Sequence, residues 1–80
     1  MIACVRYKDV EEILRQEGFS FVGSTEGHFL FENPHRPDAK PQFCTLHRPN
    51  PMDTIAEISV IESFEAAEID IPRWDVLWSD

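Results

Sequence analysis

The strongest constraint on the fold is a pair of short alternating segments joined by a four-residue turn. Phe19–Gly23 alternates aromatic and small residues, and His28–Glu32 alternates phenylalanines with other side chains. A period of two places successive side chains on opposite faces of a β-strand. The intervening Ser24–Gly27 is rich in turn-forming residues, so the two segments are predicted to form a β-hairpin. An antiparallel sheet is therefore the centre of the expected fold.

A proline-rich segment separates this hairpin from a third predicted strand. Residues 33–41 contain three prolines in nine positions, a density that excludes a central strand and favours a loop. Residues 42–47 (Gln-Phe-Cys-Thr-Leu-His) favour a strand, which Arg48 and Pro49 close. The predicted sheet thus has three strands.

A helix is predicted before the strands. Asp9 is a suitable N-cap, and Glu12 three residues later completes a capping-box pattern. Apolar residues then recur on one helical face, and Gly18 is placed to end the helix in the left-handed conformation. We expect a helix of about ten residues here.

A second helix is predicted after the strands. Asn50 serves as its cap and Pro51 as its first residue, and an apolar stripe continues to about Ile69. The last residues form an aromatic tail in which Trp74 and Trp78 are four positions apart. The two indoles either pack onto this chain or anchor a protein partner.

The resulting element order is α-β-β-β-α, an α+β chain of 80 residues with room for one core. A three-stranded antiparallel sheet with both helices on one face buries the apolar residues in two layers. This arrangement is that of a double-stranded-RNA-binding-domain-like (dsRBD-like) fold, although the same order could pack otherwise. We expect a single domain over 1–80, with 70–80 as a short C-terminal tail.

Acidic residues outnumber basic ones by fifteen to seven, for a formal net charge of −8. This balance argues against a broad nucleic-acid surface and against an anionic membrane, and we expect no direct contact with DNA. No apolar run approaches the length of a membrane span, and the N-terminus lacks a signal-peptide core, so a cytoplasmic protein is expected. The charge is uneven: residues 33–49 carry net +2, whereas residues 50–80 carry net −7.

The two cysteines, Cys4 and Cys44, favour reduced thiols over a disulfide. Cys44 and His47 have the C-x-x-H spacing of half a zinc site. Positions three apart on a strand point to opposite faces, however, and no second cysteine pair is present. We therefore expect no metal and no cofactor.

Histidines carry the candidate chemistry, because imidazole changes charge near neutral pH and can transfer a proton without a metal. His28 opens a strand directly after Gly27, a residue that lets a phosphate backbone approach closely. His47 ends the neighbouring strand and could lie near His28. The basic side chains that could hold phosphate oxygens are Arg36, Lys40 and Arg48. The alternative is a surface histidine beside a solvated loop.

Several of these features resemble HicA, the mRNA-cleaving toxin of HicA–HicB toxin–antitoxin pairs. The resemblance covers about residues 9–69. It rests on the Gly-Phe that ends the first helix, the glycine before His28 and an apolar strand, and the strand that ends at His47. It also rests on Pro51–Ile58, which resembles the Pro-x-Gly-Thr-Leu-x-x-Ile that opens the family's last helix.

The resemblance implies a dsRBD-like fold, metal-independent endoribonuclease activity on mRNA and a HicB-type antitoxin as partner. His28 corresponds to the family's catalytic histidine, and Gly27, Arg36, Lys40, His47 and Arg48 are the expected RNA-binding residues. The sequence leaves open whether the chain forms a homodimer.

The chain also departs from the family. It is acidic where HicA toxins are basic, Asp53 stands at the glycine that opens the last helix, and glutamates replace that helix's basic residues. A second hypothesis is therefore a catalytically degenerate HicA-fold protein that binds a protein partner through its acidic helix and Trp tail.

Overall fold

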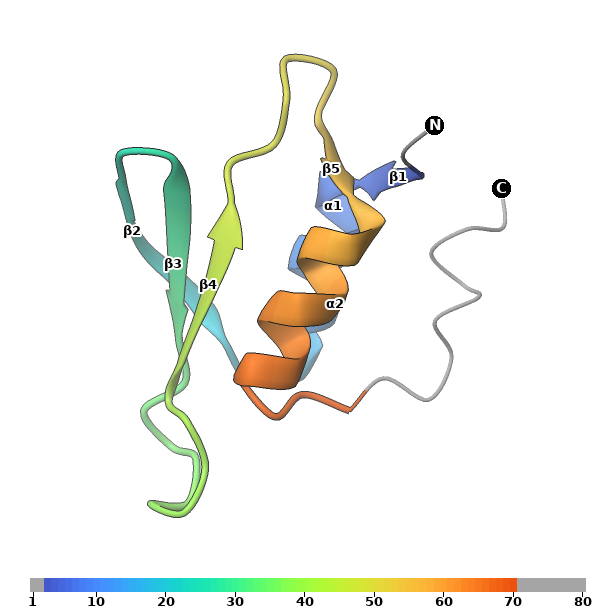
Figure 1. Cartoon of the computed structure of the whole chain (residues 1–80). Coiled ribbons are helices and arrows are strands. Elements are labelled where there is room, and N and C mark those ends of the chain that lie inside the picture. Colours follow the sequence, from blue (N-terminus) through green and yellow to red (C-terminus); the bar gives the residue numbers. More distant parts are fainter. Residues whose placement is uncertain (1–2, 71–80) are drawn as a thin grey trace.

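The computed structural model describes residues 3–70. Its elements follow the order β1-α1-β2-β3-β4-β5-α2 (Figure 1). Their bounds are β1 Cys4–Arg6, α1 Tyr7–Gln16, β2 Ser20–Thr25, β3 His28–Glu32, β4 Phe43–His47, β5 Thr54–Ala56 and α2 Glu57–Ala66. No helix within residues 3–70 is long and apolar enough to cross a membrane.

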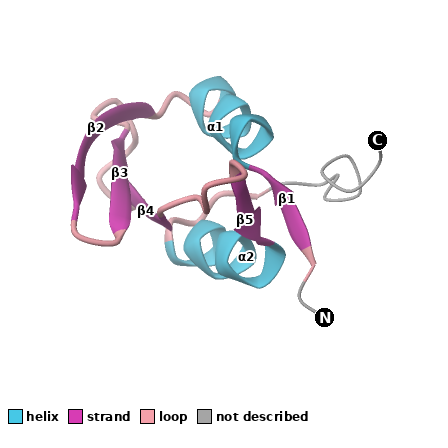
Figure 2. Ribbon diagram, turned by 90° about the horizontal axis from the view of Figure 1, so that it is seen from above, coloured by secondary structure: helices cyan, strands magenta, loops and turns pink. Residues whose placement is uncertain are grey.

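The three predicted strands form one antiparallel sheet in the order β2-β3-β4. Both helices lie on the same side of this sheet (Figures 1 and 2). The prediction of an α+β chain with two helices and a three-stranded antiparallel sheet is confirmed. The hairpin turn is shorter than predicted, because β2 extends to Thr25 and only Glu26 and Gly27 remain outside the strands.

A second, two-stranded sheet was not predicted. β1 and β5 pair antiparallel, with Val5 opposite Ile55, and both of these side chains are buried. β1 leads directly into α1 and β5 directly into α2. The small sheet therefore joins the N-terminal ends of the two helices, as Figure 2 shows.

The predicted start of the first helix is wrong. Arg6, not Asp9, occupies the N-cap, where no side chain caps the helix, and the Tyr7 N–H donates to the Asp53 carbonyl at 2.9 Å. Asp9 lies in the first turn, where its carboxylate accepts a hydrogen bond of 2.9 Å from the Arg6 guanidinium. The predicted end is correct: the chain leaves the helix through Gly18 at φ 89°. Here the Asn33 amide nitrogen donates to the Glu17 carbonyl at 3.0 Å.

The predicted start of the second helix is also wrong. The Asn50 side-chain oxygen accepts hydrogen bonds from the backbone N–H groups of Met52 and Thr54, at 2.9 and 3.1 Å. Asn50 thus caps a tight turn rather than a helix, and the chain passes through Asp53 at φ 60°. The helix begins six residues later than predicted, at Glu57 instead of Pro51, because Thr54–Ala56 pairs with β1.

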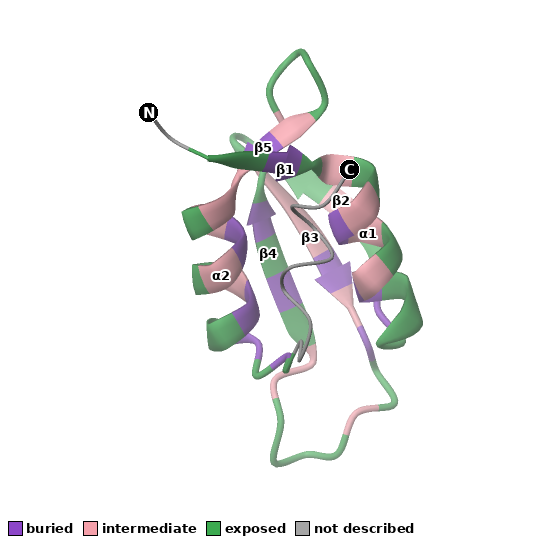
Figure 3. Cartoon of the chain, turned by 90° about the vertical axis from the view of Figure 1, so that its right-hand side faces the viewer, coloured by how far each residue is buried: buried purple, intermediate pink, exposed green. Residues whose placement is uncertain are grey.

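The core lies between the sheet and the helices. The buried positions of α2 face the alternate buried positions of β4, and α1 also turns its buried positions toward the interior (Figure 3). Twelve buried apolar side chains form one cluster: Val5, Val10, Leu14, Phe19, Phe31, Cys44, Leu46, Ile55, Val60, Phe64, Ala67 and Ile69. One face of the sheet is thus committed to packing. Neither helix covers the other face of the sheet (Figures 1 and 2).

Candidate functional site

Two of the predicted site residues, His28 and His47, are direct neighbours. They are cross-strand partners at the hairpin end of β3 and β4. Their ring centroids are 4.9 Å apart, with the rings tilted by 49°. Partner residues of an antiparallel ladder carry their side chains on the same face, which accounts for this contact. His28 is half-buried and His47 is exposed, so the pair is open to solvent on one side.

The two-residue turn before β3 places glycine backbone beside these imidazoles. Gly27 has φ 83°, and no atom lies within 4 Å of the position that its Cβ would occupy. The N–H of Arg48 donates to the Gly27 carbonyl at 3.1 Å, which extends the ladder past His47. The Arg48 guanidinium lies over the ring of Phe29, 5.5 Å from its centroid. Gly27, His28, His47 and the backbone of Arg48 therefore lie at one end of the sheet, while the Arg48 guanidinium lies with Phe29 on the face opposite the imidazoles.

The other two predicted RNA-binding residues lie elsewhere. Arg36 and Lys40 belong to the loop that follows the opposite end of β3, so the length of a five-residue strand, about 16 Å, separates that loop from the histidines. The Arg36 side chain is already occupied: it lies over the Phe19 ring at 5.0 Å and donates to carbonyl oxygens at the end of α2. Lys40 is exposed. The structure thus divides the predicted basic set between two sites.

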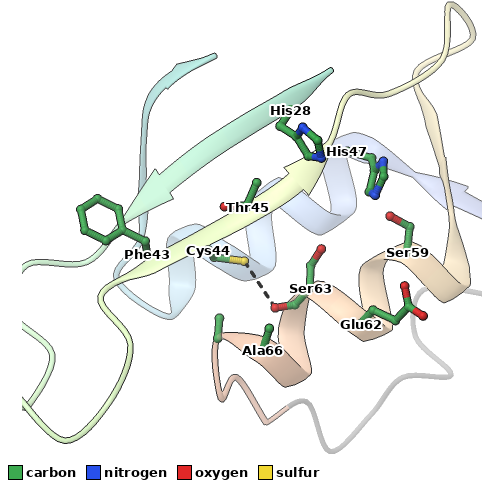
Figure 4. Close-up of a pocket in the computed structure, with 10 residues that line it drawn as sticks. His28, Phe43, Cys44, Thr45, His47, Ser59, Glu62, Ser63 and Ala66 are labelled. Carbon is green, nitrogen blue, oxygen red and sulfur yellow. Dashed lines mark hydrogen bonds between the residues drawn. The ribbon is translucent and has the colours of Figure 1, made fainter. Parts of the chain in front are cut away.

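A groove runs from the histidine pair along the junction of β4 and α2 (Figure 4). Its volume is about 320 Å³. The residues that line it are His28, Phe43, Cys44, Thr45, His47, Ser59, Glu62, Ser63, Ala66 and Ala67. Figure 4 shows His28 and His47 above the α2 side chains Ser59 and Glu62. The hydroxyl oxygen of Ser59 is buried and has no hydrogen-bond partner among the described residues.

The Cys44 thiol is a packing group. Its sulfur donates a weak hydrogen bond to the Ser63 carbonyl at 3.9 Å, and burial raises the pKa of the thiol to about 11, against an opposing effect of the Arg36 charge. No disulfide joins it to Cys4, which is exposed in β1. Cys44 is buried while His47 is exposed, so the C-x-x-H pair lies on opposite faces as predicted. Within residues 3–70 no group of three or more His, Cys, Asp or Glu side chains could hold a metal ion.

The α2 wall of the groove was not predicted from the sequence. Ser59, Glu62, Ser63 and Ala66 recur at helical spacing, which makes them one small and polar face of α2. That spacing was a usable signal. The four residues lie inside the predicted helix, but the tertiary packing sets which face of α2 meets β4, so the sequence did not mark them as a wall of the site. Trp74 and Trp78, the predicted aromatic anchors, lie outside the described residues.

Comparison with protein families, with curated proteins and with solved structures finds no match to this chain.

Proposed function

We propose that this chain is a metal-independent endoribonuclease of the cytoplasm, a divergent HicA-like toxin on a dsRBD-like scaffold. Its RNA substrate would be mRNA, and a HicB-type antitoxin would be its partner. The observation that carries the proposal is the contact between His28 and His47, with ring centroids 4.9 Å apart. Helices on one side of a three-stranded antiparallel sheet also agree with the HicA-like reading of the sequence.

Two adjacent imidazoles are suited to cleavage of a ribose–phosphate backbone. In its neutral form, His28 takes the proton of a ribose 2′-hydroxyl, and the oxygen attacks the adjacent phosphorus. The bond from phosphorus to the 5′-oxygen breaks, and His47 in its protonated form gives that oxygen a proton. The products are a 2′,3′-cyclic phosphate and a 5′-hydroxyl end. Arg48 follows His47 at this end of the ladder and could turn from Phe29 toward the phosphate, and the open backbone at Gly27 lets the strand approach.

The charge distribution limits the RNA contact to a small one. Arg48 is the only Lys or Arg of residues 3–70 that adjoins the histidine pair in the β3–β4 ladder, and α2 carries no Lys or Arg. One to three phosphate contacts give a logarithmic salt dependence of about −1 to −2 on a single strand. A steeper dependence would require a basic surface that the described residues lack.

The test is cleavage of an end-labelled single-stranded RNA by the purified chain. We expect His28→Ala and His47→Ala each to reduce the cleavage rate by about 10²–10⁴, because each removes one proton-transfer group. His35→Ala is the matched control, since His35 is exposed in the proline-rich loop. We also expect EDTA to have no effect, and an RNA that is 2′-O-methylated throughout to stay intact. Equal cleavage by His28→Ala and His35→Ala would refute the proposal.

A second candidate function is a non-catalytic protein-interaction module. The observation that favours it is the charge of the segment from Glu57 to Asp70, which contains five acidic residues and no Lys or Arg. Such a surface suits a basic protein better than RNA. If the wild-type chain leaves RNA intact and binds a basic protein, this candidate replaces the ribonuclease.

A further inference from the structure

We propose that the groove between β4 and α2 binds an extended, basic peptide segment of a protein partner, which adds to the sheet as a strand beside β4. The proposal gives the second candidate function a site and a class of partner. It does not depend on RNA cleavage, because its tests measure peptide binding alone.

Within residues 3–70, β4 has a free edge on the side away from β3. Asn33 N–H donates to the Gln42 carbonyl at 2.7 Å, and Arg48 N–H donates to the Gly27 carbonyl at 3.1 Å. Residues on an antiparallel strand alternate between hydrogen-bonded and non-hydrogen-bonded positions. The backbone N–H and C=O groups of Cys44 and Leu46, which lie at even positions between these two bonds, therefore point toward β3. The odd positions of β4 direct their N–H and C=O groups away from β3, and these are Phe43, Thr45 and His47.

No other strand of residues 3–70 pairs with β4 on that side, since β4 ends the sheet order β2-β3-β4. A free strand edge is a ready template for a further strand. Phe43, Thr45 and His47, whose backbone groups point away from β3, line the groove (Figure 4). Five residues span about 16 Å, enough to pair with a peptide strand of similar length.

The opposite wall leaves space for such a strand. α2 presents Ser59, Ser63 and Ala66 to the groove, three of the smallest side chains available. Beside the edge, Phe43 is 50% exposed and offers apolar surface to the side chains of an added strand. The Ser59 hydroxyl, buried without a hydrogen-bond partner among the described residues, lies on the same wall.

The acidic residues in and beside the groove favour a basic peptide. Glu62 lines the groove, and the segment from Glu57 to Asp70 carries five acidic residues and no Lys or Arg. A second copy of this chain pairing edge to edge would bring two such helices near one another, and their like charges would repel. A segment rich in Lys or Arg gains from the same field. We therefore assign the groove to a basic peptide rather than to a second copy.

The first test uses a fluorescein-labelled octapeptide that alternates Lys and Val, with blocked ends, in 50 mM salt. We expect binding by fluorescence anisotropy, and none for the matched Glu–Val peptide. Glu62→Lys should weaken binding about tenfold, while Glu65→Lys, the same change one turn away and outside the groove lining, should weaken it less than about threefold. Equal effects of the two variants, or equal binding of the two peptides, would overturn the proposal.

The second test addresses strand addition. Two further Lys–Val peptides are N-methylated, one at every Val and the other at every Lys. A strand bonds its neighbour through alternate residues only, so one pattern should abolish binding and the other leave it within about threefold. Equal loss with both patterns would indicate charge attraction without strand pairing, and would overturn the proposal.

The matching change in the protein is Thr45→Pro. Proline removes only the outward N–H of Thr45, and proline is tolerated at such edge positions. We expect peptide binding to fall at least about tenfold while the far-ultraviolet circular dichroism spectrum is retained. If this variant does not fold, the methylated peptides decide the question. Unchanged binding by folded Thr45→Pro would overturn the proposal, as would concentration-dependent dimerisation of the chain in sedimentation without peptide binding.

Discussion

Arg36→Ala should destabilise the fold strongly, although sequence reasoning placed Arg36 among the RNA contacts. The guanidinium donates to three carbonyl oxygens, those of Pro41 (2.9 Å), Ala67 and Glu68 (3.0 Å). Ala67 is the C-cap of α2, so the cation also lies at the negative end of that helix. Its central carbon Cζ lies 5.0 Å from the centroid of the buried Phe19 ring.

The loss in the free energy of unfolding that Arg36→Ala causes follows from these contacts. A hydrogen bond to a charged group contributes about 1.5–3 kcal/mol. The carbonyls at the helix end can bind water once the side chain is gone, so the three bonds are not additive. With a cation–π contribution of about 0.5–1 kcal/mol, the expected loss in the free energy of unfolding is about 2–4 kcal/mol. For a domain of this size, 1 kcal/mol shifts Tm by about 4–8 °C, so Tm should fall by about 10–25 °C.

Thermal unfolding followed by circular dichroism measures this effect, with Lys40→Ala as the matched control. Lys40 belongs to the same loop and carries the same charge, but its side chain is exposed, so its removal should change stability by less than about 0.5 kcal/mol. Arg36→Lys should recover only part of the loss, because an ammonium cannot reproduce the fork of the guanidinium. The reasoning is refuted if Arg36→Ala and Lys40→Ala have the same Tm.

Two further predictions concern stability. Gly18→Ala should cost about 2–4 kcal/mol in chemical denaturation, because Gly18 has φ 89° and an added Cβ would lie 2.7 Å from the Asn33 amide nitrogen. Gly27→Ala, at φ 83° in open space, should cost only about 1 kcal/mol, and equal costs would contradict the steric argument. The stability of the wild type should fall as pH rises from about 9 to 11, since folded Cys44 keeps its proton (pKa about 11) where the unfolded thiol loses it. Cys44→Ala should show a smaller fall in urea denaturation over this range, by up to about 2–3 kcal/mol, and an identical fall would exclude the thiol as a cause.

The histidine site was partly predictable. The hairpin and the third strand follow from local alternation and turn residues, so the sequence could place His28 and His47 at the ends of neighbouring strands. Whether their rings touch depends on the pairing register, and a shift of one residue would put one imidazole on the other face. The groove was not predictable in the same way, because its second wall comes from α2, and only the tertiary packing decides which face of that helix meets β4.

The basic residues show the limit of reasoning from composition. Arg36, Lys40 and Arg48 lie within a net positive stretch of sequence, and on that basis they formed one candidate set. In the folded chain β4 separates the loop that holds the first two from Arg48. Only the approach of the loop to the end of α2 shows that Arg36 acts as a helix cap. Charge in a sequence window says nothing about which cations share a site.

By itself, the sequence determined the elements whose signals are local: the hairpin, the proline-rich loop, the third strand and the glycine end of α1. Their patterns rest on a period of two and on residues with special backbone conformations, which act within a few positions. The tertiary structure alone decided the β1–β5 pair, since strands of three residues carry no pattern and pair across about fifty positions. The tertiary structure also decided that Asn50 caps a turn. An asparagine side chain can cap either a turn or a helix, and here the pairing of β5 with β1 selects the turn.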